Sequence, residues 1–132
     1  MLHYLGVDHI GHLQGFNSDL FPVKLNEMDD VFRSIFDSVT FSAQTQNESY
    51  LFLVTGDHGM TKSGNHGGST RDETHTALIF VSNNKSHNFP SGYSKVPPLK
   101  ERTFLQIDIA PTIAALFNFP TPAKSQGRII SP

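Results

Sequence analysis

The segment "YLFLVTGDHGM", residues 50–60, carries the strongest indication of the fold. Tyr50–Thr55 is a continuous apolar run rich in β-forming residues and bounded by polar ones, which predicts a strand buried on both faces. Asp57 and His58 follow this run directly. In open α/β sheets, functional groups gather where strands end at their carboxyl edge, so this pair marks a candidate site.

The segments on either side predict an α/β protein. Two more apolar runs, residues 2–7 and 77–82, predict further strands, and apolar residues recurring every three to four positions over 23–39 predict an amphipathic helix. A last helix is predicted from Asp108, which can act as a cap, with Pro111 in the first turn. Alternating strands and helices favour a largely parallel sheet.

The composition narrows the class of protein. A chain of 132 residues is enough for one domain, and a net charge of -2 argues against a nucleic-acid partner, because nothing neutralises a row of phosphates. The chain has no cysteine, so a metal ion would be held by His nitrogen and carboxylate oxygen, ligands that suit zinc or manganese. No apolar stretch is long enough to span a bilayer.

A second acidic and imidazole cluster follows the first predicted strand. Asp8 and His12 are four residues apart, and Gly11 between them relaxes the backbone so that both side chains can reach one ion. If the two strands run parallel, Asp8 and Asp57 lie on the same rim of the sheet. His66 lies in a glycine-rich loop that can swing over the same place. The predicted metal ligands are Asp8, His12, Asp57, His58 and His66.

The other histidines receive weaker interpretations. His9 and His75 are predicted to line the site without binding metal. His3 falls inside the first predicted strand and is interpreted as a packed or edge residue, and His87 as part of an exposed loop.

The polar stretch at residues 42–49 and the predicted loop at residues 83–100 each contain an N-glycosylation sequon. The first is Asn47-Glu48-Ser49 and the second is Asn84-Lys85-Ser86. Both sequons agree with a luminal location, although such short motifs also arise by chance.

Three segments resemble, in the same order, the ethanolamine phosphate transferases of glycosylphosphatidylinositol (GPI) anchor assembly, which belong to the alkaline phosphatase superfamily. They are "HYLGVDHIGH" (3–12), "TGDHGMTKSGNHGG" (55–68) and "QIDIAPTIAALFNFPTPAKSQGRII" (106–130). The chain is most similar to the subtype that modifies the second mannose, although Phe16 stands where the family pattern has Pro.

The resemblance implies that residues 1–132 are a partial catalytic domain: the carboxyl-terminal part of a three-layer sandwich of alkaline phosphatase type with a mostly parallel sheet. It assigns Asp8, His12 and His66 to one divalent ion, and Asp57 and His58 to a second, zinc or manganese in each case. In the family, another Asp and a nucleophilic Thr complete the second site. They are expected upstream of Met1, and no Thr of this chain matches the nucleophile.

The implied reaction moves phosphoethanolamine from phosphatidylethanolamine to a mannose of the GPI anchor precursor, on the luminal side of the endoplasmic reticulum. The enzyme would be held in the membrane by segments outside this chain and could include a stabilising subunit. The chain alone is predicted not to catalyse transfer. Two alternatives stay open: a metal-dependent phosphodiesterase or pyrophosphatase of the same superfamily, and a non-catalytic fragment with at most a structural metal.

Overall fold

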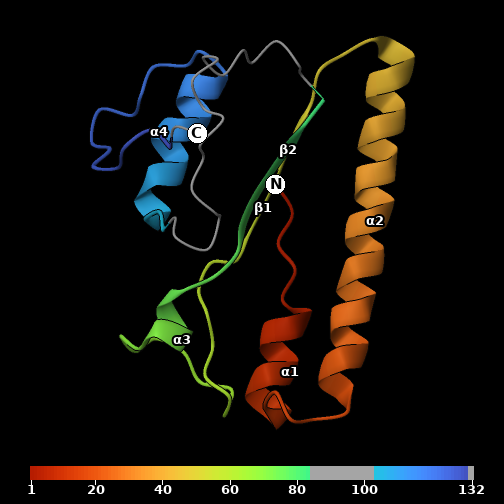
Figure 1. Ribbon diagram of the computed structural model, residues 1–132, viewed down its shortest axis with the longest axis vertical. Helices are drawn as coiled ribbons and strands as arrows, with labels where there is room; N and C mark the ends of the chain where they lie inside the picture. Colours follow the sequence, from red (N-terminus) through yellow and green to blue (C-terminus); the bar gives the residue numbers. More distant parts are fainter. Residues whose placement is uncertain (84–102, 131–132) are drawn as a thin grey trace, which may run out of the picture. The chain divides into compact units, whose positions relative to one another are not determined.

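The computed structural model describes residues 1–83 and 103–130, which belong to two compact units, Met1–Lys85 and Ser86–Pro132. Each unit is described by itself. In chain order, the first contains α1 (Gly6–Gln14), α2 (Leu20–Gln46), β1 (Leu51–Thr55), α3 (Arg71–Thr74) and β2 (Leu78–Ser82) (Figure 1). The second contains the 3-10 helix η2 (Gln106–Asp108) and α4 (Ile109–Leu116).

The predicted first strand, residues 2–7, is wrong. Gly6–Gln14 forms α1, and the residues before it have no regular structure. Asp8 and His12, one turn apart, lie on the same face of this helix, with Asp8 Oδ1 and His12 Nε2 3.5 Å apart. An apolar run of six residues does not by itself distinguish a strand from a buried helix, and this one continues as a helix.

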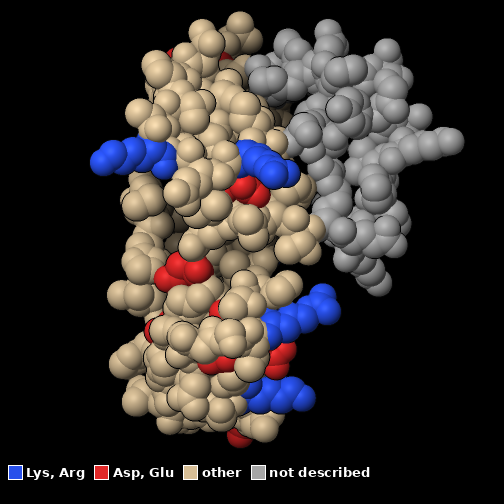
Figure 2. Space-filling model, turned by 90° about the vertical axis from the view of Figure 1, so that its left-hand side faces the viewer, with Lys and Arg blue, Asp and Glu red and all other residues tan. Residues whose placement is uncertain are grey.

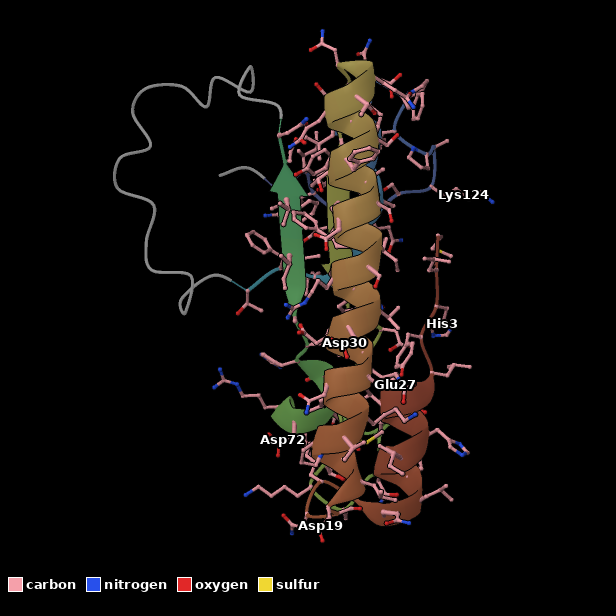
Figure 3. The ribbon with its side chains drawn as sticks, turned by 90° about the vertical axis from the view of Figure 1, so that its right-hand side faces the viewer. His3, Asp19, Glu27, Asp30, Asp72 and Lys124 are labelled. Atoms are coloured by element: carbon pink, nitrogen blue, oxygen red, sulfur yellow. The ribbon has the colours of Figure 1, made fainter. Side chains whose placement is uncertain are left out.

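The segment before α1 is attached to α2 instead of to a sheet. The Tyr4 hydroxyl donates a 2.7 Å hydrogen bond to Glu27, which also accepts from Lys24 at 2.6 Å. Figure 3 shows His3 on this segment, beside the part of α2 that carries Glu27. These contacts fix α1 against the amino-terminal part of α2 (Figure 1).

The predicted helix over residues 23–39 is confirmed and extends further at both ends, to Leu20 and Gln46. Pro22 is tolerated because it lies in the first turn, where a missing N–H leaves no hydrogen bond unmade. At the other end, the polar stretch that begins at Ser42 is helical as far as Gln46, with the Thr45 hydroxyl donating to the Phe41 carbonyl at 3.0 Å. The helix ends at Asn47, whose φ of 54° is left-handed.

The strands predicted at residues 50–55 and 77–82 are confirmed as β1 and β2, but the predicted parallel sheet is wrong. The two strands pair antiparallel, with Leu53 opposite Phe80 at the centre. Parallel pairing needs a crossover connection, usually a long helix, and the connection here contains only the four-residue α3. Within the described residues the sheet has two strands, so the α/β class holds while a covered parallel sheet is not seen.

One face of this sheet packs against α2. The ring of Phe36 on α2 lies 5.6 Å from Phe52 and 6.2 Å from Tyr50, both in edge-to-face geometry. Both strands are only partly buried, in contrast to the predicted burial on both faces. Among the described residues, Ala43 is the buried hydrophobic side chain of the first unit, and Ala114 and Pro111 are buried in the second.

The second unit is organised by Asp108. The predicted helix is confirmed as α4, but the Asp108 side chain does not cap it. Its carboxylate accepts the backbone N–H of Arg128 at 2.8 Å and of Leu105 at 2.9 Å, and these bonds lower the pKa of Asp108. The Thr112 hydroxyl extends the network, donating to the Asp108 carbonyl at 2.6 Å and accepting from Ile130 N–H at 2.9 Å.

None of the helices described here combines the length and apolar character that a membrane span requires. On the face shown in Figure 2, both basic and acidic side chains reach the surface. The predicted loop 83–100 lies largely outside the described residues, and the sequon at Asn84 and His87 lie wholly outside them.

Candidate metal centre

The glycine-rich loop after β1 is held in shape by its own backbone. Thr61 N–H bonds the Asn65 carbonyl at 2.9 Å, and Gly64 N–H returns to the Thr61 carbonyl at 2.9 Å. Gly59 N–H bonds the Glu73 carbonyl at 2.8 Å, which ties the start of the loop to α3. The loop therefore forms a compact turn that carries His66 back towards His58.

A close contact between two glycines brings this loop onto α1. Gly64 has a φ of 84°, and a Cβ added there would collide with the carbonyl oxygen of Gly11. Gly11 is buried in α1, and a Cβ added to it would collide with the Met60 sulfur. Only glycine permits both the left-handed backbone and so close an approach. This contact, and not a shared sheet rim, is what joins the two predicted ligand clusters.

Three imidazoles surround one carboxylate oxygen at the resulting junction. Asp8 Oδ1 lies 3.5 Å from Nε2 of His12, 3.5 Å from Nε2 of His66 and 4.0 Å from Nε2 of His58. One ligand atom from each of Asp8, His58 and His66 falls within 4.8 Å of the others. The structure thus brings together four of the five residues predicted as ligands, from α1 and from both ends of the loop.

The donor set fits a small divalent cation. Ligand atoms about 2.1 Å from a tetrahedral zinc ion are separated by about 3.4 Å, close to the spacing of Asp8 Oδ1 from His12 and His66. Asp8 Oδ1 is also buried and has no hydrogen-bond partner among the described residues. A buried carboxylate oxygen without a partner is costly, and a bound cation would remove that cost.

The ring of His58 is oriented by its backbone. Its Nδ1 lies 2.8 Å from the Gly59 carbonyl oxygen, which can only accept, so Nδ1 carries the proton. Nε2 then presents its lone pair towards Asp8, as a metal ligand requires. The ring stacks on His66 with centroids 3.7 Å apart, and the His66 ring lies 4.8 Å from that of His12.

Asp57 lies at the outer edge of the cluster. Its Oδ1 accepts the His58 backbone N–H at 3.1 Å and is 3.8 Å from His58 Nε2, so His58 stands between Asp57 and Asp8. Its Oδ2 is 3.9 Å from Nε2 of His3, a residue that sequence reasoning placed in a strand and left out of the site. The only sequence signal for His3 was its distance of five residues from Asp8.

His9 and His75 were predicted to line the site. His9 is exposed on α1, and among the described residues no contact joins its side chain to the cluster. His75 follows α3, where its Nδ1 lies 3.2 Å from the Thr74 hydroxyl. It lines a separate hollow together with Phe16, Met60, Lys62, Arg71 and Asp72.

Glu73 supports the loop that carries His66, and sequence reasoning missed it. Its carboxylate accepts Gly68 N–H at 3.0 Å and both the N–H and the hydroxyl of Thr70. The hydroxyl bond from Thr70, and next the N–H of Gly68, lower the pKa of Glu73, so the carboxylate stays charged and holds the loop at neutral pH. The signal in the sequence was the spacing of Thr70 and Glu73, which is that of a capping box.

Replacing Glu73 with Ala is expected to weaken zinc binding by about tenfold, because residues that orient metal ligands typically contribute factors of this size. The change frees Gly68 and so the backbone two residues after His66. Asp72→Ala, on the adjacent and exposed residue of α3, is the matched control and should bind zinc unchanged. Calorimetric zinc titration measures both variants, and equal affinities would show that Glu73 does not position the loop.

Comparison with known proteins gives the family. No family model matches the chain, and no solved structure matches it. "GPI ethanolamine phosphate transferase 2" of Saccharomyces cerevisiae is 43% identical over 142 residues, covering 98% of this chain and 17% of that protein. The Candida albicans protein of the same name is 42% identical over 133 residues, covering 98% of this chain and 14% of that protein. The chain belongs to the GPI ethanolamine phosphate transferase 2 family.

The relationship extends beyond fungi. "GPI ethanolamine phosphate transferase 2, catalytic subunit" of Homo sapiens is 37% identical over 134 residues, covering 100% of this chain and 13% of that protein. The chain thus spans less than one fifth of the length of these GPI ethanolamine phosphate transferase 2 relatives. The resemblance drawn from the three motifs is confirmed.

Proposed function

We propose that this chain supplies the metal-binding part of an enzyme that transfers phosphoethanolamine to the second mannose of the GPI anchor precursor. The observation that carries the proposal is Asp8 Oδ1, buried and without a partner among the described residues, with three imidazole nitrogens 3.5–4.0 Å around it. The names of the relatives supply the reaction. Phosphatidylethanolamine is the proposed donor.

Two divalent ions are proposed, zinc or manganese. Asp8, His12 and His66 would hold the first, and Asp57 and His58 the second, with His58 close to both carboxylates. When bound, such ions neutralise charge on the phosphoryl oxygens and lower the pKa of an attacking hydroxyl. The protein's own part is to hold the ligand atoms together through the contact of Gly11 with Gly64 and the Nδ1 bond of His58.

The nucleophile is proposed to be a Thr outside these 132 residues. The three Thr residues that flank the site are committed to local hydrogen bonds. The Thr55 hydroxyl donates to the Gly56 carbonyl, that of Thr61 to the Asn65 carbonyl, and that of Thr70 to Glu73. A hydroxyl held in this way is poorly placed to attack a phosphodiester, so we expect the chain by itself to be inactive.

The wider setting is part of the same proposal. The chain would form the carboxyl-terminal part of a sandwich of alkaline phosphatase type, on the luminal side of the endoplasmic reticulum. The two strands leave edges free for pairing within the described residues, which supports contacts with further polypeptide. Membrane attachment would come from other segments. The human relative is named a catalytic subunit, which supports a stabilising partner.

The test is a transfer assay with labelled phosphatidylethanolamine and a mannosylated GPI precursor, using the native product of the gene that encodes this chain. Label is expected on the mannose, to be lost on metal chelation and restored by zinc. Labelled phosphoethanolamine released to water instead would replace the transferase proposal with a phosphodiesterase. Turnover by the 132-residue chain alone, abolished by Asp57→Ala, would refute the proposal that a residue outside the chain is needed.

A further inference from the structure

The sequon Asn47-Glu48-Ser49 occupies the connection between α2 and β1. Asn47 is the left-handed residue that ends α2, with its N–H bonded to the Ala43 carbonyl. The Glu48 N–H bonds the same carbonyl at 2.9 Å. The backbone of the sequon therefore leaves the helix abruptly at the end of α2 (Figure 1). The Asn47 side chain is exposed.

Polar side chains on both sides of the sequon make hydrogen bonds, and among the described residues those of the sequon itself do not. Asn83 accepts Tyr50 N–H at 2.9 Å and donates to the Glu48 carbonyl at 3.0 Å. Gln46, on the helical side, donates to the Ser42 hydroxyl at 3.2 Å. Throughout the described residues, however, the side chains of Asn47 and Ser49 make no hydrogen bond and are exposed.

A purely structural role explains only half of this arrangement. Glycine is the residue most often found at the left-handed position that ends a helix, and asparagine is the next, which accounts for Asn47. It does not account for Ser49, whose hydroxyl makes no hydrogen bond to a cap, turn or sheet within the described part of the chain. The pair of free side chains at this spacing is what an N-glycosylation acceptor requires.

We propose that Asn47 is N-glycosylated, a proposal that rests on the luminal location in the proposed function. The side-chain nitrogen of Asn47 attacks the anomeric carbon of a lipid-pyrophosphate-linked oligosaccharide. The nitrogen loses one proton as the C–N bond forms, and the lipid pyrophosphate leaves with the bonding electron pair. The glycan is bulky and soluble, and it fits the exposed helix end without displacing any contact.

The position also keeps the glycan away from the metal centre. The 27 residues of α2 span about 40 Å. Asn47 lies at the carboxyl end, while α1, which carries Asp8, packs beside the amino-terminal part through the bond of Tyr4 to Glu27 (Figure 1). Glycosylation at Asn47 therefore leaves the site open, and losing the glycan should change transfer activity by less than about twofold.

The experiment uses the native gene product made in eukaryotic cells, in an Asn84→Gln background so that only the first sequon remains of the two in this chain. Before digestion, Asn47→Gln and Ser49→Ala should each run faster than the Asn84→Gln protein by one glycan, and Ser49→Thr should run level with it. Digestion with an N-glycosidase should bring all these proteins to the same mobility. Asn26→Gln is the matched control, because Asn26-Glu27-Met28 has the same first two residues on α2 but no Ser or Thr.

The outcomes separate this proposal from the proposed function. An Asn47→Gln protein that runs level with the Asn84→Gln protein before digestion overturns glycosylation at Asn47, even if the protein transfers phosphoethanolamine. A mobility difference that both Asn47→Gln and Ser49→Ala produce, and that digestion removes, supports it, even if the transfer assay shows no activity and the proposed function falls.

Discussion

Changing Asp8 to Asn in the native gene product is expected to lower zinc affinity at least about 100-fold and to abolish phosphoethanolamine transfer. The carboxylate oxygen at the centre of the three imidazoles would become a neutral amide atom, a much poorer ligand for a hard or borderline cation. The metal-free protein should not lose stability, because Oδ1 is buried without a hydrogen-bond partner and a neutral amide atom costs less there than a charged oxygen.

A loss of zinc affinity without a loss of metal-free stability distinguishes a carboxylate that binds metal from one that only supports the fold. Thermal unfolding with and without zinc gives the stability of each form, and calorimetric titration gives the affinity. Asp30→Asn, on the exposed surface of α2, is the matched control and should keep both the zinc-induced stabilisation and the transfer activity. An Asp8→Asn protein that zinc still stabilises as strongly as the wild type would exclude this oxygen as a ligand.

Changing Gly64 to Ala is expected to destabilise the fold by more than about 3 kcal/mol and to weaken zinc binding as well. A left-handed residue with a side chain costs about 1–3 kcal/mol by itself. Here the added Cβ would also collide with the Gly11 carbonyl oxygen, which cannot turn away without distorting α1. His66, two residues further on, would move away from Asp8 as the loop shifts.

Gly67→Ala is the control for the backbone term alone. Gly67 is also left-handed, with a φ of 97°, but a Cβ added there has no atom within 4 Å. The Gly67→Ala protein should be destabilised only by the conformational cost of a side chain at a left-handed residue. Its zinc affinity should stay closer to that of the wild type. Chemical denaturation measures the two free energies of unfolding, and equal losses would mean that the contact between Gly11 and Gly64 does not join the clusters.

Much of the secondary structure could be predicted because burial and periodicity report directly on it. The apolar run before Asp57 is a strand, and the three-to-four spacing over residues 23–39 is a helix. Periodicity does not report strand direction, which depends on the path of the connection, and here the short α3 allowed β2 to return antiparallel. The same run of apolar residues suits a strand or a helix, so the segment at Leu2–Val7 was misassigned.

The meeting of the two ligand clusters was predicted, but for the wrong reason. The expected shared rim required a strand before Asp8 and a parallel sheet, and the structure has neither. Asp8 and His66 meet because glycines at 11 and 64 let a helix and a loop touch. The four-residue spacing of Asp8 and His12 is that of one helix face, but it was interpreted as a fold of the chain at Gly11. The support from Glu73 could not be read from ligand chemistry, because it acts through backbone N–H groups.

The contact between Gly64 and α1 also limits which second mutations can restore a protein that carries Gly64→Ala. The atom that a new methyl group would strike belongs to the main chain, so no choice of side chain at position 11 can make room for it. A search for intragenic suppressors of a Gly64→Ala allele should therefore return true reversion to glycine, or changes that reroute the loop, and none at position 11. Where the loop meets α1, the residues that evolution can accept are limited by the space between two backbones and not by side-chain chemistry.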